Sequence, residues 1–265
     1  FGKGGFPAAG IAGAAIASSV SEAVSLLFFI IYTSMTADKR KYGFRRAFTL
    51  RPHLLKGMLS ISGWTMVQSF ISVSIWFIFF LAIEHLGERP LAVTNIVRNI
   101  SALLIMVISA FATTAGALIS NQIGAGEQRC LFKTCGMTLK LTYAILIPLL
   151  IILCLFPESV LRAFTDSPSL IAASVNSVYV MASSTLIMAP SFILFNAVSG
   201  TGNTRAGFIM EMISLAVYTA VIYYGIIRLK PDVALCWFSE HVYGVTLIFL
   251  AWWYLKSGKW RGKKV

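Results

Sequence analysis

Four ionisable residues of this sequence fall inside long apolar stretches, namely Glu22, Arg98, Glu211 and Glu240. A charge near the centre of a lipid bilayer costs at least about 2.5–3.5 kcal/mol on insertion scales, so it persists there only with a partner or with water. A carboxyl group that gains and loses its charge in such surroundings can bias two conformations of a protein. We therefore expect these four residues to lie on an ion or substrate pathway.

Glu211 is the acid that is hardest to explain structurally. It lies about two turns into its apolar stretch, on a helical face that also carries Gly207, Ser214 and Tyr218. Its stem is shorter than that of Lys or Arg, so it reaches less far toward the membrane surface. A functional role is the favoured interpretation for Glu211, whereas an interfacial position or a structural ion pair is the alternative for Arg98 and Glu240.

Neutral polar residues recur at alternating steps of three and four, which is the spacing of a seam buried between helices. The most regular stripe lies in the third apolar stretch and comprises Asn95, Asn99, Ala102, Met106, Ser109, Thr113, Gly116 and Ser120. A second stripe comprises Ser62, Thr65, Ser69 and Ser72, with Gln68 beside it. Asn95, Asn99, Ser109 and Gln68 join the pathway candidates; the alternative is that small residues only permit close helix packing.

Seven apolar stretches are long enough to position these residues within a membrane, since a spanning helix needs about 20 mainly apolar residues. Of the 265 residues 57% are hydrophobic and 12% are charged, far from the roughly 25% charged residues of soluble domains. The sequence predicts an all-α, polytopic membrane protein. The predicted helices cover residues 8–37, 54–86, 91–121, 137–156, 170–198, 207–229 and 233–255.

Basic residues divide unevenly between the two sides that these seven helices define. One side carries 16 Lys and Arg residues, in segments 38–56 and 122–140, at Arg205 and in the C-terminal tail, and the other side carries 5. The positive-inside rule makes the first side cytoplasmic. The sequence thus predicts a multi-pass protein of the plasma membrane, the inner membrane in bacteria, with its C-terminus in the cytoplasm.

Several other classes of function find no support in the sequence. It has no H-E-x-x-H, G-x-S-x-G or Walker A motif, so we expect no catalytic residues and no enzyme activity. Its four cysteines lack the spacing of a metal site, and we expect neither a metal site nor a cofactor. The formal charge of +12 lies mostly between spans and sets membrane orientation, so we do not expect a nucleic-acid partner.

Three segments resemble the multidrug and toxic compound extrusion (MATE) transporters. The segment Phe6-Pro7-Ala8-Ala9-Gly10-Ile11-Ala12-Gly13-Ala14-Ala15-Ile16-Ala17 is similar to the entry of that family's sixth helix. The segments Leu118-Ile119-Ser120-Asn121-Gln122-Ile123-Gly124-Ala125-Gly126 and Asn196-Ala197-Val198-Ser199-Gly200-Thr201-Gly202-Asn203-Thr204-Arg205 are similar to its two cytoplasmic helix ends. The order and spacing of the segments fit the family along essentially the whole chain.

The resemblance implies two six-helix bundles around a cavity that opens alternately to each side of the membrane. The chain begins at Phe1 rather than Met, and we expect it to be a C-terminal fragment. Residues 1–37 would be the last helix of the N-terminal bundle, 38–53 a basic cytoplasmic linker, 54–256 the C-terminal six-helix bundle and 257–265 a basic tail. Its partners would be the lipid bilayer and the missing N-terminal bundle of the same chain.

The function that the resemblance implies is secondary active efflux of amphipathic or cationic drugs and other toxic compounds, coupled to Na⁺ or H⁺. The alternative is a flippase of lipid-linked oligosaccharides in the same superfamily. Some branches of the family carry acids in helices seven and ten, and by spacing those positions are Ser72 and Met188 here. Neither side chain carries a charge, so the coupling acid is either Glu211, Glu240 or Glu22, or it lies in the missing bundle.

Overall fold

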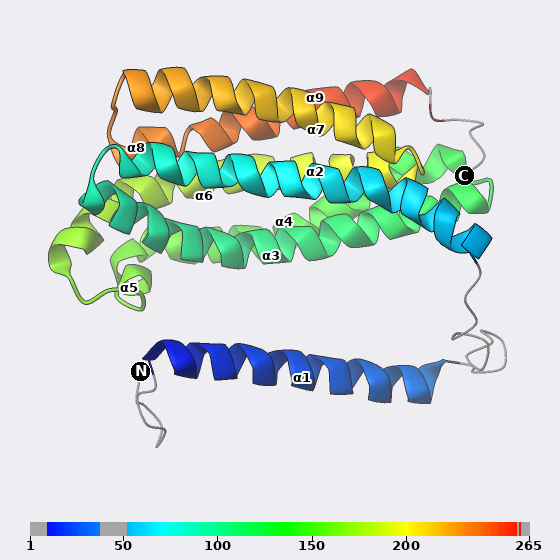
Figure 1. Cartoon of the computed structure of the whole chain (residues 1–265), viewed down its shortest axis with the longest axis horizontal. Coiled ribbons are helices and arrows are strands. Elements are labelled where there is room, and N and C mark those ends of the chain that lie inside the picture. The colour runs from blue at the N-terminus through cyan, green and yellow to red at the C-terminus, as the bar shows by residue number, and fades with distance from the viewer. Residues whose placement is uncertain (1–9, 38–51, 259, 261–265) are drawn as a thin grey trace. The chain divides into compact units, whose positions relative to one another are not determined.

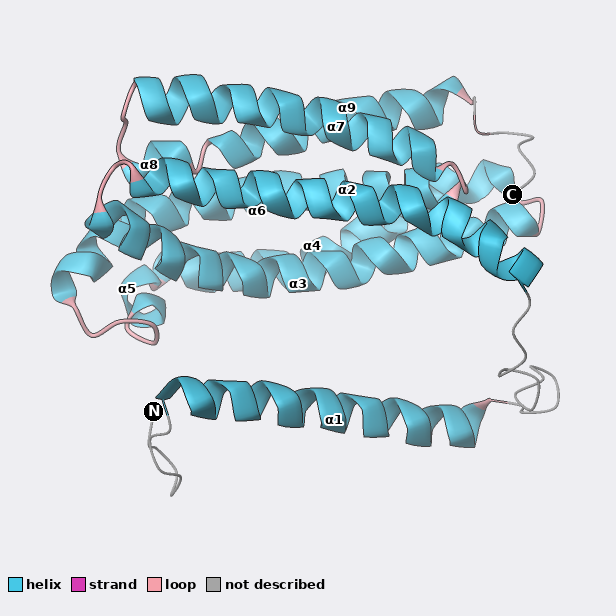
Figure 2. Cartoon of the chain, in the orientation of Figure 1, coloured by secondary structure: helices cyan, strands magenta, loops and turns pink. Residues whose placement is uncertain are grey.

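The computed structural model describes residues 10–37, 52–258 and 260 as helices joined by short turns, with no strand in these ranges (Figures 1 and 2). The chain divides into two compact units, Phe1–Lys56 and Gly57–Val265. Within its described part, the first unit contains α1 (Gly10–Thr36) and the first turn of α2. The basic linker predicted at 38–53 and the tail predicted at 257–265 lie almost wholly outside the described residues.

The second unit is a bundle of roughly antiparallel helices (Figure 1). Its main elements are α2 (Pro52–Glu84, from Gly57 onward), α3 (Glu88–Gly124), α4 (Leu131–Leu155), α6 (Pro168–Gly200), α7 (Thr204–Val221) and α9 (Ser239–Ser257). Shorter elements are the 3₁₀ turn Gln128–Cys130, α5 (Pro157–Leu161) and α8 (Val233–Cys236). Seven helical segments of the described chain are long and apolar enough to cross a membrane, as the sequence predicted.

One predicted helix start was wrong, and one short helix was not predicted. The helix predicted at 137–156 begins at Leu131, because the turn after α3 is short and the polar first turns of α4 extend past its apolar stretch. The short helix α5 was not predicted; it begins at Pro157, whose fixed φ suits the first position of a helix. The other predicted bounds differ from the observed ones by a few residues, since helix ends follow capping and not hydropathy.

The helix α7 continues into a seven-residue π-helical segment, Ile222–Arg228. Such segments are rare and concentrate at functional sites. At its other end, α7 is capped by Asn203, whose side chain accepts a hydrogen bond from the Ala206 backbone N–H at 3.2 Å. The Asn203 amide also donates to the Tyr254 hydroxyl at 2.6 Å. One residue of the family-like segment therefore both starts α7 and ties it to α9.

The centre of the bundle is the packing of α3 against α6, with α9 and α4 also against α6. Gly116 of α3 and Gly200 of α6 let the two backbones meet, since a Cβ atom on Gly116 would lie 2.9 Å from the Asn196 carbonyl oxygen. A Cβ atom on Gly200 would overlap the carbonyl oxygen of Gly116. In this part of the bundle, small residues serve close approach, as the alternative interpretation of the stripes proposed.

Candidate functional site

Glu211 is buried at a junction of three helices. It lies on α7, its side chain is 3% exposed, and its Oε1 atom accepts hydrogen bonds from Ser72 Oγ of α2 at 2.8 Å and from Tyr243 Oη of α9 at 2.9 Å. The Tyr243 hydroxyl also lies 3.1 Å from Oε2. Hydroxyl donors of this kind stabilise the charged form of a carboxylate. A change in the charge of Glu211 would therefore alter the contacts of α2, α7 and α9 together.

Glu240 forms a second pair of the same kind between the same two helices. It lies in the first turn of α9, and its Oε1 atom accepts a hydrogen bond from Tyr218 Oη of α7 at 2.7 Å. The two pairs are reciprocal, because α7 supplies one acid and one tyrosine and α9 supplies the others. The Tyr218 and Tyr243 rings meet edge to face, with centroids 5.8 Å apart. The four side chains thus form one cluster across the α7–α9 interface, in which two hydrogen-bonded pairs meet through their tyrosine rings.

Arg98 does not form the ion pair that was the structural alternative for it and for Glu240. No ion pair of either residue is found within the described ranges. The Arg98 guanidinium instead lies 5.3 Å from the centroid of the Phe80 ring and 6.0 Å from that of Trp76. Its buried Nε atom has no hydrogen-bond partner in the described chain. Cation–π contacts hold this charge apart from both acids.

Among the remaining candidates, Gln68 adjoins the Glu211 contact, because its backbone carbonyl lies 3.0 Å from Ser72 Oγ, and no side-chain contact to either acid is found for the others in the described chain. The Asn95 amide donates to the Leu91 carbonyl of its own helix at 3.1 Å. Asn99 is exposed, and Ser109 and Gln68 are partly exposed. Glu22 is exposed on α1, in the first unit. Their place on a pathway stays a prediction.

Sequence reasoning missed Tyr243, which makes two of the three contacts to Glu211. A signal was present, since Tyr243 follows Glu240 by three residues and so shares a helical face with it. The role of Ser72 was also missed. The resemblance implies an acid at that position in some branches, whereas here Ser72 bonds to an acid supplied by α7. Met188, the second such position, lies beside Gly244, next to Tyr243.

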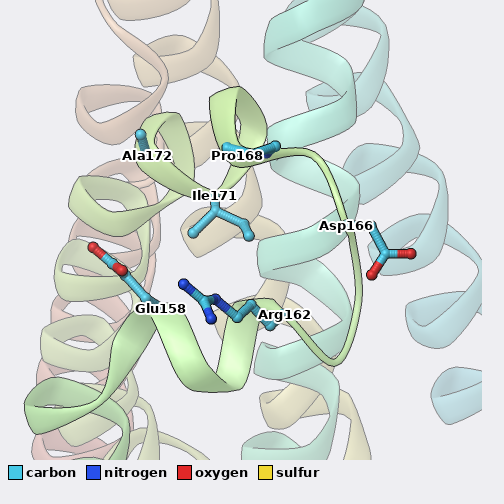
Figure 3. Close-up of a pocket in the computed structure, with 6 residues that line it drawn as sticks. All are labelled: Glu158, Arg162, Asp166, Pro168, Ile171 and Ala172. Carbon is cyan, nitrogen blue, oxygen red and sulfur yellow. The ribbon is translucent and has the colours of Figure 1, made fainter.

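A cavity of about 360 Å³ lies elsewhere, beside α5 and the start of α6, where Glu158, Arg162 and Asp166 are among its lining residues. In Figure 3 the Arg162 side chain extends toward the Glu158 side of this cavity, whereas the Asp166 carboxylate points away. None of the residues predicted for the pathway lines it. The cluster between α7 and α9 is therefore the stronger candidate site.

Sequence comparison gives relatives of one kind. The MatE family profile matches residues 65–224. "Probable multidrug resistance protein NorM" of Thermotoga maritima is 25% identical over an alignment of 282 residues, which covers 100% of this chain and 57% of that protein. "Uncharacterized transporter YisQ" of Bacillus subtilis is 24% identical over 227 residues, covering 81% of this chain and 47% of that protein. The chain thus spans about half the length of these curated relatives.

Solved structures share the fold. The Vibrio cholerae MATE transporter VcmN, in a point-mutant form, superposes with a TM-score of 0.71 at 15% identity over 80% of this chain and 48% of that one. A MOP superfamily transporter from Pyrococcus furiosus gives a TM-score of 0.67 at 14% identity over 75% of this chain and 44% of that one. That transporter is described as having a binding pocket of reversed polarity, which suggests a different function. At these identities the likeness establishes the fold alone.

Proposed function

The chain belongs to the MatE family, whose members are transporters and not enzymes, and from this we propose that it forms one bundle of a cation-coupled exporter of amphipathic or cationic compounds. The proposal includes alternating access, in which the cavity between two bundles opens to each side in turn. The similarity to a probable multidrug resistance protein supports the substrate class. The coupling ion would be Na⁺ or H⁺.

One observation carries the proposal, namely the buried Glu211 carboxylate held by Ser72 and Tyr243 from two other helices. A carboxylate in a membrane interior is retained at a cost and is by default a functional group. Its three-helix position means that binding a cation would weaken the hydrogen bonds of α2 and α9 to α7 at one point. An ion that favours one helix arrangement over another in this way can drive a conformational cycle.

The test uses the full-length protein in lipid vesicles, with ethidium as the transported cation and an imposed pH or Na⁺ gradient. Glu211→Gln keeps the size and an oxygen acceptor for Ser72 and Tyr243 but cannot take up or release a charge. We expect it to insert normally and to reduce gradient-driven efflux to the level of empty vesicles. Glu84→Gln, at an exposed acid at the end of α2, is the matched control and should transport normally. Parental efflux by Glu211→Gln, with unchanged pH and Na⁺ dependence, would refute the role of Glu211.

The orientation of the protein is part of the same proposal. The 16-to-5 division of basic residues favours a cytoplasmic location for the 38–51 segment and the tail. Cysteines introduced at Arg46 and at Lys263 should then resist an impermeant thiol reagent in intact cells. A cysteine introduced at Ser167, just before α6, should react. The opposite labelling pattern would reverse the topology.

A further inference from the structure

The α7–α9 interface contains a buried hydroxyl that its own helix does not use. The Ser214 side chain is 0% exposed, and its Oγ atom has no hydrogen-bond partner in the described chain. Serine and threonine in helices commonly donate to the carbonyl one turn earlier, as Thr138, Thr142 and Ser174 do here. An unused buried hydroxyl costs about 1–3 kcal/mol. Thr94, Ser177 and Ser191 also carry such a hydroxyl in the described chain, so Ser214 differs from them by its place in the bundle and not by lacking a partner.

The position of Ser214 distinguishes it from the other buried hydroxyls. It follows Glu211 by three residues and precedes Tyr218 by four, so all three side chains lie on one face of α7. That face packs on α9, where Glu240 and Tyr243 are the partners of Tyr218 and Glu211. Ser214 therefore lies between Glu211 and Tyr218 along the face of α7 that meets α9.

We propose that Glu240, Tyr218, Ser214, Tyr243 and Glu211 form one proton-transfer path across the α7–α9 interface, with Ser214 holding a bridging water between the two tyrosine hydroxyls. The proposal rests on the proposed function and assigns H⁺ as its coupling ion. A buried water needs two to four polar partners, and Ser214 with the two tyrosine hydroxyls supplies three. The path links the first turn of α9 to the three-helix junction at Glu211.

Proton transfer along the path balances without any further reactant. When Glu240 is protonated, the Tyr218 hydroxyl turns from Glu240 to donate to the water. The acid proton of Glu240 then passes to the Tyr218 oxygen while the Tyr218 hydroxyl proton passes to the water. The water releases one of its own protons to Tyr243, whose hydroxyl proton passes to the Glu211 carboxylate. At the end Glu240 is charged, Glu211 is neutral, and both tyrosines and the water are neutral as before. One charge has moved between the two acids, and no bond other than O–H has changed.

The surrounding elements bring no competing charge to this path. The helix α6, which packs on α7 and α9, and the helix α8, which packs on α6, contain no Asp, Glu, Lys, Arg or His. From α2 the contact is the neutral Ser72, and Arg98 of α3 is directed at aromatic rings. On α9 itself, His241 shares a hydrogen bond with Ser183 at 2.9 Å. Asp232 accepts from the Val233 backbone N–H.

The hydroxyls of Ser72 and Tyr243 that contact Glu211 are suited to proton transfer, because a hydroxyl is both a donor and an acceptor. Hydroxyl chains of this kind pass protons by exchanging donor and acceptor roles.

The decisive variant is Ser214→Ala in the full-length protein, reconstituted in vesicles that contain a pH-sensitive dye. If the unused hydroxyl were only an unfavourable packing group, its removal would leave transport unchanged or stabilise the protein. As part of a proton path, its loss should slow both proton flux and pH-driven ethidium efflux by about tenfold or more. Ser214→Thr keeps a hydroxyl and should restore much of the rate. Parental flux in Ser214→Ala would overturn the proposal.

A matched control is available on α6, where Ser177 is also 0% exposed with an unpartnered hydroxyl in the described chain. Ser177→Ala should leave the flux unchanged, whereas an equal loss in both alanine variants would mean that buried hydroxyls act through stability and would overturn the path.

Glu240→Gln should match the loss in Ser214→Ala. If Glu211→Gln is inactive while Glu240→Gln and Ser214→Ala transport normally, the path fails and the role of Glu211 stands. If a Na⁺ gradient alone drives efflux without proton movement, the path likewise fails.

Discussion

Two interfaces of the bundle are built in opposite ways. The α3–α6 interface is held by backbone approach at Gly116 and Gly200, around buried apolar side chains such as Ile193 and Ile119. The α7–α9 interface is held by hydrogen bonds whose acceptors, Glu211 and Glu240, can change charge. Close packing has one good arrangement, since interiors tolerate neither voids nor overlap. Hydrogen bonds to an ionisable acid have two arrangements, one for each protonation state.

We therefore expect the α3–α6 and α7–α9 interfaces to have different roles. The close glycine contact leaves no room between the backbones of α3 and α6 at this point, so we expect these two helices to act as a rigid frame. Along the proposed proton path, the α7–α9 interface would change its hydrogen bonds when a proton arrives or leaves. The π-helical segment Ile222–Arg228, which begins four residues after Tyr218, adds a backbone irregularity to the same helix. Substitutions in the α3–α6 interface should therefore impair folding, whereas substitutions in the α7–α9 interface should impair transport.

The largest effect on stability is expected from Gly200→Val. Its side chain would overlap the Gly116 backbone, and a backbone cannot move aside as a flexible side chain can. We expect destabilisation of about 3 kcal/mol or more, measured as lost folded yield and a lower Tm in detergent. Gly136→Val on α4, where a Cβ atom would meet open space, is the control. A stable, active Gly200→Val protein would show that the α3–α6 frame is adaptable.

A smaller loss of stability is expected from Tyr243→Phe, which removes one of the two hydroxyl donors of Glu211 and keeps the ring contact with Tyr218. A hydrogen bond to a charged acceptor contributes about 1.5–3 kcal/mol. We expect the free energy of unfolding to fall by an amount in that range at a pH at which Glu211 is charged. The matched measurement is Tyr243→Phe in a Glu211→Gln background, where the loss should shrink. Equal losses in both backgrounds would mean that the bond does not depend on charge.

The smallest effect on stability is expected from the hydrogen bonds between α4 and α6. Pro190 lacks an N–H, which deprives the Leu186 carbonyl of its helical donor, and the Tyr143 hydroxyl of α4 replaces that donor at 2.7 Å. Tyr143→Phe should cost about 1 kcal/mol, measured by thermal unfolding. Tyr179→Phe removes a longer bond of 3.4 Å between the same helices and should cost less. A larger loss in Tyr179→Phe than in Tyr143→Phe would mean that the Tyr143 bond to Leu186 is not the stronger α4–α6 contact.

Several features of the protein follow from the sequence alone. Hydropathy gives the all-helical membrane fold and its seven spans, because a bilayer requires every backbone group to be bonded within its own segment. The same rule makes Glu211 conspicuous, since an acid in an apolar run has few structural reasons to be there. Local turn chemistry also indicates the end of α6, where Gly202 adopts a positive φ of 79° and Asn203 caps α7.

The partners of each polar residue were decided by tertiary structure. Ser72 and Glu211 are 139 residues apart and Tyr243 lies a further 32 along the chain, so helical periodicity carries no information on their contact. Arg98 could as well have paired with Glu240 on sequence grounds, and packing placed it against Trp76 and Phe80 instead. Periodicity tells which face of a helix is polar, whereas the bundle geometry decides which faces meet and which hydroxyl, such as that of Ser214, is left without a partner in the described chain.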